Sequence, residues 1–356
     1  MSIDNNYLII MAGGVGSRFW PMSTSDCPKQ FLDVLNIGRT LIQQTADRFE
    51  GIVPKENIMV VTSQKYKLLV REQLHFLTDN QILLEPCMRN TAPCIAYGVW
   101  KIIKRNREAN IIVAPSDHLI TREEDFKNVI NEGIRFIAST ESLLTLGMKA
   151  HKAETGYGYI HASLQSAIEG YTQLYPVSRF AEKPNKATAE QYLLDGDYFW
   201  NSGIFLWSAR NIEKAIRSYL PEVAEIFDKG TNLFDTASEQ EFINEEFPKC
   251  TNISVDYGIL EKADNIYVKT ADFGWSDLGT WGSLHEQSDK TGEGNVVKGN
   301  IRTFDTQDSI IRISSDKKVV VVQGLNNYIV VDTGEALLIC NKDEEQRIKE
   351  FQAEFL

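Results

Sequence analysis

The sequence predicts an α/β fold, in which a mixed, mostly parallel sheet is covered by helices and followed by a small β domain. Short apolar runs alternate with segments of helical periodicity over most of the chain, which is typical of such a sheet. Closely spaced short strands, separated by turn residues, occupy the C-terminal part. A polar stretch with glycines, 288–293, separates the two parts. We therefore expect a large domain at 1–287 and a small β-rich domain with a terminal helix at 288–356.

The apolar runs of the large domain define its expected strands, and the periodic segments between them define its helices. Strands are expected at 8–12, 58–62, 82–85, 111–114, 143–147, 175–181, 199–207 and 266–270. Helices are expected at 40–49, 63–77, 91–103, 123–138, 186–194, 209–219 with a continuation through 227, 254–262, and after Trp281. Polar clusters follow three of the first four strands, and in such sheets ligands bind at the carboxyl ends of strands. These ends form the candidate site.

The small domain is expected to contain short strands and one helix. The strands are expected at 296–304, 309–313, 319–323, 328–332 and 336–340, and the helix at 343–355.

A glycine-rich turn follows the first apolar run. Its glycines, which allow close approach of a phosphate to backbone amides, are Gly13, Gly14 and Gly16. Arg18 and Lys29 add positive charge beside it and are candidate partners of phosphate oxygens. A dinucleotide-binding loop would need a further glycine where Phe19 stands, and the Gly-Lys-Ser/Thr of a Walker loop is absent. The turn is therefore neither of these two loops, which excludes an NAD-binding oxidoreductase.

The composition limits the class of partner. The net charge of −12 argues against a nucleic-acid surface, which usually has a basic excess. No apolar run reaches the length of a membrane span, and the N-terminus lacks the pattern of a signal peptide. The cysteines are scattered, odd in number and never spaced Cys-x-x-Cys, so we expect a cytoplasmic protein without disulfides. Cys27, near the glycine turn, is either a reactive thiol or a small loop residue.

Two aspartates, Asp117 and Asp277, each follow an apolar strand. One or two carboxylates together with substrate phosphates commonly hold Mg²⁺. Each aspartate alone is better explained as an Asx-turn or a helix cap than as a metal ligand. Their combination with a phosphate-binding turn favours a Mg²⁺ site.

The segment GGVGSRFWP followed by PKQF resembles the opening of the sugar-1-phosphate nucleotidyltransferases, and most of all that of mannose-1-phosphate guanylyltransferases. Further segments similar to the family's motifs follow in the same order: EP with RNTAP, APSDH, TGYG, FAEKP, WNSG, SVDY and GWSDLG. Together they cover nearly the whole large domain. One departure is Ala181, where the family usually has valine, and we expect it to affect packing rather than chemistry.

The resemblance implies a fold and a reaction. The fold is a Rossmann-like nucleotidyltransferase domain followed by a small β domain, for which the family often has a short left-handed β-helix. The reaction makes GDP-mannose and pyrophosphate from GTP and α-D-mannose 1-phosphate, by in-line, Mg²⁺-assisted attack on the α-phosphorus.

The resemblance also implies roles for individual residues. The catalytic residues are Arg18, Lys29, Lys183 and Asp277. The nucleotide-binding residues are Ala12, Gly13, Gly14, Gly16, Ser17, Arg18, Lys29, Glu85, Asn90, Thr91, Ser116 and Asp117. The sugar-phosphate-binding residues are Gly156, Tyr157, Gly158, Glu182, Lys183, Asn201, Gly203 and Asp277. The metal ligands are Asp117 and Asp277. Glu85 could instead be a structural cap, and Lys183 part of a solvated turn.

Other readings of the same sequence remain open. A glucose-1-phosphate thymidylyl- or uridylyltransferase would keep the enzyme class and change both substrates. A catalytically inactive regulatory subunit would lose Arg18, Lys29, Asp117, Lys183 or Asp277, all of which are present. The family resemblance further implies a homodimer. Longer relatives append an isomerase domain, and we expect no isomerase activity here.

Overall fold

The computed structural model describes residues 3–14, 16–315 and 317–354. By compactness the chain divides into two units, each made from segments that are far apart in the sequence. Unit 1 consists of Met1–Gly13, Gln43–Ser116 and Ile120–Trp275. Unit 2 consists of Gly14–Ile42, Asp117–Leu119 and Ser276–Leu356. Most of the segment that carries the glycine turn is thus grouped with the C-terminal residues. The division at residue 287 remains a prediction.

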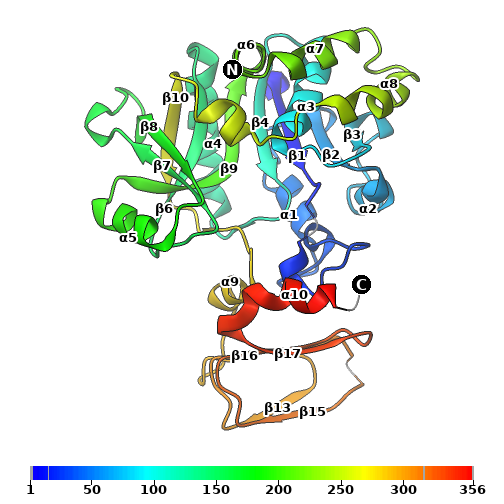
Figure 1. Cartoon of the computed structure of the whole chain (residues 1–356), viewed down its shortest axis with the longest axis vertical. Helices are drawn as coiled ribbons and strands as arrows, with labels where there is room; N and C mark the ends of the chain where they lie inside the picture. The colour runs from blue at the N-terminus through cyan, green and yellow to red at the C-terminus, as the bar shows by residue number, and fades with distance from the viewer. Residues whose placement is uncertain (1–2, 15, 316, 355–356) are drawn as a thin grey trace. The chain divides into compact units, whose positions relative to one another are not determined.

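Unit 1 is built on a nine-stranded mixed sheet in the order β3-β2-β1-β4-β9-β6-β10-β8-β7 (Figure 1). The strands are β1 (Asn6–Met11), β2 (Ile58–Ser63), β3 (Ile82–Glu85), β4 (Asn110–Pro115), β6 (Leu143–Lys149), β7 (Gly158–Ala162), β8 (Leu174–Glu182), β9 (Tyr198–Ser208) and β10 (Ile266–Ala271). The pairs β3–β2, β2–β1 and β1–β4 are parallel, as is β6–β10. Strand β9 is antiparallel to both of its neighbours β4 and β6. The predicted mixed sheet is confirmed, but it is not mostly parallel, because four of its pairings are parallel and five are antiparallel.

The strand order reverses between β1 and β4, which are neighbours in the parallel part of the sheet. Both strands are buried almost throughout, because their runs of Ile, Leu and Val have no polar face. They pair in parallel, with Leu8 opposite Ile112 and Met11 opposite Pro115. Ligands of open α/β sheets bind at such a reversal, beyond the carboxyl ends of the strands.

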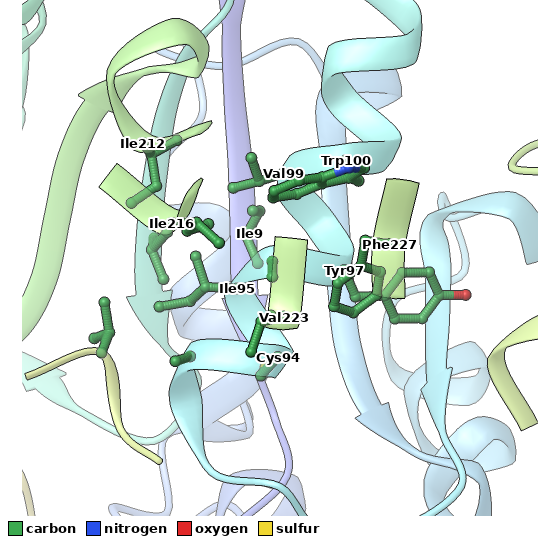
Figure 2. Packing of buried hydrophobic residues seen from close by; sticks show 14 of the residues in the cluster. Ile9, Cys94, Ile95, Tyr97, Val99, Trp100, Ile212, Ile216, Val223 and Phe227 are labelled. Carbon is green, nitrogen blue, oxygen red and sulfur yellow. The ribbon is translucent and has the colours of Figure 1, made fainter. Parts of the chain in front are cut away.

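Helices cover both faces of this sheet. The longer ones are α2 (Lys67–Gln73), α3 (Thr91–Arg105), α4 (Glu123–Ser139), α5 (Lys186–Asp195), α6 (Ala209–Tyr219), α7 (Pro221–Lys229) and α8 (Glu239–Glu246). On one face, Ile9 of β1 lies in a buried cluster with Val99 of α3, Ile216 of α6 and Val223 of α7 (Figure 2). On the other, Gly133 of α4 lies so close to Leu206 that a Cβ there would be 3.0 Å from it.

Short helical turns complete unit 1. They are η1 (Ile3–Asn5), η4 (Lys55–Asn57), η5 (Gln64–Tyr66), η6 (Asp79–Gln81), η7 (Leu164–Ser166), η8 (Phe247–Lys249) and η9 (Asp256–Leu260), the last with π-helical geometry. A separate two-stranded sheet pairs β5 (Leu119–Ile120) with β11 (Trp275–Ser276).

The C-terminal part of unit 2 winds between two small sheets (Figure 1). The strands are β12 (Val296–Lys298), β13 (Ile301–Phe304), β14 (Ile310–Ile313), β15 (Val320–Gln323), β16 (Tyr328–Asp332) and β17 (Leu337–Asn341). Strands β12, β14 and β16 pair in parallel in one sheet, β13 and β15 pair in parallel in the other, and β17 closes the first sheet antiparallel to β16. The chain thus forms coils of a β-helix, with Ile301, Ile311 and Val322 buried between the sheets.

Helical segments from both ends of the chain pack on this β part. They are η2 (Ser17–Phe19), η3 (Lys29–Phe31), the start of α1 (Leu41–Asp47), α9 (Trp281–Gln287), η10 (Lys342–Arg347) and α10 (Ile348–Ala353). Phe19 of η2 shares one buried cluster with Trp281 of α9, Leu338 of β17 and Ile348 of α10. This cluster explains why segments so distant in the sequence form one compact unit.

Two predicted elements of the small domain were wrong in extent. The strand expected at 296–304 is broken into β12 and β13, because Gly299 between them has a φ of +119° and turns the chain into the second sheet. The helix expected at 343–355 begins as the 3₁₀ segment η10 and becomes α-helical only at Ile348. Throughout the described residues, no helix combines the length and the apolar character needed to cross a membrane.

Candidate functional site

The reversal point of the unit 1 sheet brings together the residues that follow β1 and β4. The Ala12 amide donates to the carbonyl of Val61 at 2.8 Å, and the Ser116 amide donates to the carbonyl of Met11 at 3.1 Å. These bonds extend the parallel pairing past the strand ends. Two of the predicted nucleotide-binding residues are therefore held side by side at the expected edge of the sheet.

Glu85, the last residue of β3, is buried at the same edge. A Cβ on Gly13 would lie 3.4 Å from its Oε2 atom, so the carboxylate faces the first glycine of the turn. Its other oxygen, Oε1, is buried and has no hydrogen-bond partner among the described residues. Burial raises the pKa of Glu85 to about 7, although a hydrogen bond from the Cys94 thiol opposes the shift. An unsatisfied buried carboxylate oxygen is costly and is typical of a ligand-binding position.

Asn90 and Thr91, two further predicted nucleotide-binding residues, already have structural contacts. Asn90 caps α3, where its Oδ1 accepts from the Thr91 amide at 2.9 Å, and its φ is +65°. The Thr91 hydroxyl accepts from the Val255 amide at 2.9 Å. These contacts tie the start of α3 to the segment before η9.

Unit 2 contains a pocket lined by residues from four separate segments. They are Gly16, Arg18, Phe19, Lys29, Asp117, His118, Asp277, Gly279 and Lys349. The structure therefore brings together the two predicted cations and the two predicted metal ligands. Lys349, which belongs to no motif of the sequence, comes from α10.

Lys29 is the most constrained side chain of this pocket, with 3% of its surface exposed. Its Nζ lies 2.9 Å from Oδ2 of Asp117, 2.8 Å from the carbonyl oxygen of Asp277 and 3.0 Å from that of Leu278. An ammonium has three N–H donors, so these acceptors use all of them. Lys29 thus joins the two aspartate segments of the pocket.

Asp117 and Asp277 present carboxylates to the same pocket. Desolvation disfavours ionised Asp117, but the charges of Lys29 and His118 outweigh it and lower the pKa of Asp117. Oδ1 of Asp277 accepts from the Gly279 amide at 2.9 Å. Two such carboxylates suit a hard divalent cation that takes its other ligands from phosphates and water. A cluster of three or more metal-ligating side chains does not occur in the described parts of the chain.

The turn itself is described only in part. Gly16 has a φ of +62°, and a Cβ there would lie 2.7 Å from the Cβ of Lys29. The Gly14 carbonyl accepts from Nε2 of Gln30 at 2.9 Å. The predicted amide cradle extends from Gly13 to Ser17, where η2 begins, and includes Val15, which lies outside the described residues. Gly16 therefore allows the chain to pass closely over Lys29.

Four of the eight predicted sugar-phosphate residues, Gly158, Glu182, Asn201 and Gly203, lie on neighbouring strands of unit 1. Glu182 ends β8 opposite Gly158 of β7, and the Cβ that Gly158 lacks would collide with its carboxylate. Lys183 forms an ion pair with Glu182 and keeps 61% of its side chain exposed. The Lys183 amide donates to the Tyr157 carbonyl at 3.2 Å, which places the glycine-aromatic loop beside this pair.

Asn201 links this group to a buried carboxylate that had no predicted role. Nδ2 of Asn201 donates to Oδ1 of Asp256 at 2.8 Å, and its Oδ1 accepts from the Gly203 amide at 3.1 Å. Burial, followed by the negative charge of Glu182, raises the pKa of Asp256 to about 6. The SVDY segment was recognised as a motif, but only the fold shows that its aspartate points at Asn201.

Gly156 and Tyr157 are held by their own loop. The Gly156 amide donates to Oε1 of Glu154 at 3.0 Å. The Tyr157 ring packs edge-on against Trp200 and Trp275, with centroid separations of 5.1 and 5.4 Å. The aromatic side chains therefore act as a wall for this loop.

Residues 7–294 match the Nucleotidyl transferase family, and residues 299–354 match the MannoseP isomerase/GMP-like beta-helix domain. Mannose-1-phosphate guanylyltransferase 2 of Escherichia coli O157:H7 is 36% identical over 351 residues, which is 96% of this chain and 71% of the relative. The chain belongs to the nucleotidyl transferase family, among the mannose-1-phosphate guanylyltransferases.

Other members of the family are similar over the same length. Mannose-1-phosphate guanylyltransferase of Klebsiella pneumoniae is 36% identical over 98% of this chain and 73% of its own. A crystal structure described as mannose-1-phosphate geranyltransferase from Thermus thermophilus has a TM-score of 0.87 at 29% identity and covers 99% of both chains. The β-helix match agrees with the coils seen in unit 2. For this nucleotidyl transferase, the α/β fold and the β-helical C-terminal part are thus confirmed.

Proposed function

We propose that this chain transfers a guanylyl group from GTP to α-D-mannose 1-phosphate and releases pyrophosphate. Relatives with 36% identity over almost the whole chain are named for this activity. The observation that carries the proposal is the pocket of unit 2, in which cationic side chains and two carboxylates line one space. Such a charge pattern suits a triphosphate with a divalent cation, because it offers partners to both.

In the proposed reaction, an oxygen of the sugar phosphate attacks the α-phosphorus of GTP in line. The bond from that phosphorus to the bridging oxygen breaks, and pyrophosphate leaves. The chain needs no covalent intermediate, so its contribution is positioning and charge stabilisation. Arg18 donates to phosphate oxygens, and Lys29 fixes the aspartates of the pocket. A divalent cation held by Asp117 and Asp277, proposed to be Mg²⁺, supplies further neutralisation of phosphate charge.

For the base, we propose that Glu85 accepts hydrogen bonds from guanine. Guanine presents two adjacent donors, the N1–H and the exocyclic amino group, on its Watson–Crick edge. A carboxylate can accept both, whereas uracil and thymine offer one N–H between two carbonyls and would leave an acceptor unmatched. The buried, unpartnered Oε1 of Glu85 supports this choice. A Glu85→Gln variant should lose discrimination of GTP against UTP while retaining turnover.

For the sugar phosphate, we propose that Lys183 binds the phosphate and that Glu182 and Asn201 bind sugar hydroxyls. The exposed position of Lys183, its ion pair with Glu182, and the closeness of both Glu182 and Asn201 to Gly158 support this assignment. Removing the Lys183 ammonium should therefore raise the KM for mannose 1-phosphate more than the KM for GTP.

One assay tests the proposed function. The protein is mixed with Mg²⁺, each of GTP, UTP, dTTP and ATP, and mannose or glucose 1-phosphate, and pyrophosphate release is measured. We expect the fastest turnover for GTP with mannose 1-phosphate, and loss of turnover with a chelator that excess Mg²⁺ restores. Preference for dTTP or UTP with glucose 1-phosphate would replace the proposal. No turnover with any pair would instead indicate a regulatory subunit.

We also propose that the chain is a cytoplasmic homodimer. Phe304 of β13 and Val321 of β15 are more than half exposed, as is Val319 just before β15. Exposed apolar groups of this kind favour burial against another surface. Light scattering should give twice the chain mass, and Val321→Lys should shift it toward the monomer. A monomeric wild-type protein would contradict the dimer.

A further inference from the structure

The pocket of unit 2 contains more positive charge than its predicted residues supply. Lys349, on α10, lines it together with Arg18, Asp117 and Asp277. The residue before it, Ile348, is fully buried in the cluster that contains Phe19, which anchors the start of α10 beside η2. The position of Lys349 at the pocket is therefore fixed by core packing rather than by a surface loop.

Lys349 differs from Lys29 in what its ammonium contacts. The three donors of Lys29 are used by Asp117 and by the carbonyls of Asp277 and Leu278. Lys349 has no hydrogen bond or ion pair with any residue in the described parts of the chain. Its helical neighbour Glu350 pairs with Arg347 instead, at 3.3 Å. In this structure Lys349, unlike Lys29, retains its donors for an anion.

Arg18 is the second cation of the pocket with unused donors. Its Nε is buried and has no partner among the described residues. Loss of solvent and the positive charge of Arg18 lower the pKa of Lys349, so the two cations oppose each other. An anion placed in the pocket would remove that repulsion and satisfy both groups.

We infer that Lys349 is a phosphate-binding residue, whose ammonium donates to oxygens of the nucleoside triphosphate and of pyrophosphate. This inference rests on the proposed function and extends it, because it makes the C-terminal helix part of the substrate site. Lysine acts on phosphate as a flexible point charge, so Lys349 can follow the pyrophosphate as it separates from the α-phosphorus. The role is binding and charge stabilisation, and no proton is transferred.

Lys349→Ala tests the inference, with Lys349→Arg as the conservative variant. Lys317→Ala is the matched control, because Lys317 is an exposed lysine of the same unit that does not line the pocket. Calorimetry with the full chain and Mg²⁺ measures the binding of inorganic pyrophosphate and of GTP. Kinetics in both directions measures the KM of each substrate.

We expect Lys349→Ala to weaken pyrophosphate binding about tenfold, as for the loss of one charge-assisted hydrogen bond. The KM for pyrophosphate in the reverse reaction should rise similarly, while the KM for mannose 1-phosphate stays within about twofold. Lys349→Arg should recover most of the loss, and Lys317→Ala should behave as wild type. The exposure of Lys349 predicts an unchanged melting temperature, which excludes misfolding as the cause.

Two results would overturn the inference: Lys349→Ala binds pyrophosphate as tightly as Lys317→Ala does, or the wild-type chain binds no pyrophosphate. Failure of the proposed function has a different signature. In that case the wild-type chain turns over no GTP with mannose 1-phosphate. A Lys349-dependent affinity for pyrophosphate in such a chain would still support the phosphate site.

Discussion

At the scale of single residues, Lys29 links two segments of the pocket through three hydrogen-bond acceptors. Its Nζ is within 3.0 Å of Asp117, of the Asp277 carbonyl and of the Leu278 carbonyl. Lys29→Met keeps the apolar stem and removes the charge. We expect it to reduce the free energy of unfolding by about 2 kcal/mol, because Asp117 loses its ion pair and the two carbonyls lose their donor. Urea denaturation measures this change, and turnover should fall with it.

The Asp117→Asn variant provides the control for this prediction. When Asp117→Asn is combined with Lys29→Met, no unpaired carboxylate remains. The loss of unfolding free energy in this double variant should therefore be smaller than the sum of the losses in the two single variants. Strict additivity would show that Lys29 and Asp117 do not interact. It would also contradict the role of Lys29 in joining the two aspartate segments of the pocket.

Asp256 gives the protein a pH dependence with a defined sign. Burial and the charge of Glu182 raise its pKa to about 6 from the ordinary 3.8, so the folded state binds this proton more tightly than the unfolded state. The contribution of Asp256 to the free energy of unfolding is most favourable below about pH 4, and it is lost as the pH rises through 6. The free energy of unfolding of Asp256→Asn, relative to that of the wild type, should therefore rise by about 2 kcal/mol between pH 4.5 and pH 7.5.

Denaturant melts at the two pH values measure that gain. Nδ2 of Asn201 can still donate to the amide oxygen of the variant, so the change isolates the charge. Asp264→Asn, at an exposed position of the same unit, is the control and should show no such pH-dependent gain. An equal effect from both variants would contradict the assignment to Asp256.

At the scale of elements, the glycines of the turn differ in whether the fold leaves room for a side chain. Gly16 has a φ of +62°, and an added Cβ would meet that of Lys29 at 2.7 Å. Gly14 has no atom within 4 Å of an added Cβ. We expect Gly16→Ala to lower the melting temperature by several degrees, because both the backbone and Lys29 must shift. Gly14→Ala should change it by about one degree or less in the same thermal melt.

Similar losses in the two variants would mean that the turn does not depend on the left-handed conformation at Gly16. The Lys29→Met variant offers a further check, since the clash with the Lys29 stem persists there. Gly16→Ala should therefore remain destabilising in that background.

The sequence identified the elements whose pattern is local. Strands β1 and β4 were predicted because their buried runs are uniformly apolar, and α3 because Asn90 provides its cap. The break between β12 and β13 was not predicted, because it depends on the positive φ of Gly299. The pairing of Asp256 with Asn201 and the place of Lys349 in the pocket arise from tertiary packing. Periodicity within a segment carries no signal for either contact.

At the scale of the whole molecule, the segment Gly14–Ile42 and the C-terminal segment share one compact unit. Phe19 and Ile348 lie in the same buried cluster, although they are near opposite ends of the chain. Contacts in this cluster therefore join residues that are far apart in the sequence. Unit 2 can complete its core only after both segments have folded against each other. The order of the glycine turn is thereby coupled to the folding of the β-helical coils.

This coupling predicts an effect of a core change in α10 on the distant turn. Ile348 is 0% exposed, so Ile348→Ala should cost about 3 kcal/mol of unfolding free energy. Hydrogen exchange should then accelerate in residues 17–35 as well as in α10, because both ends share the cluster. Ile339→Ala is the control, since Ile339 on β17 is 58% exposed and should change neither. Faster exchange confined to the C-terminal residues would show that the turn is ordered without the β-helical part, which would contradict the coupling.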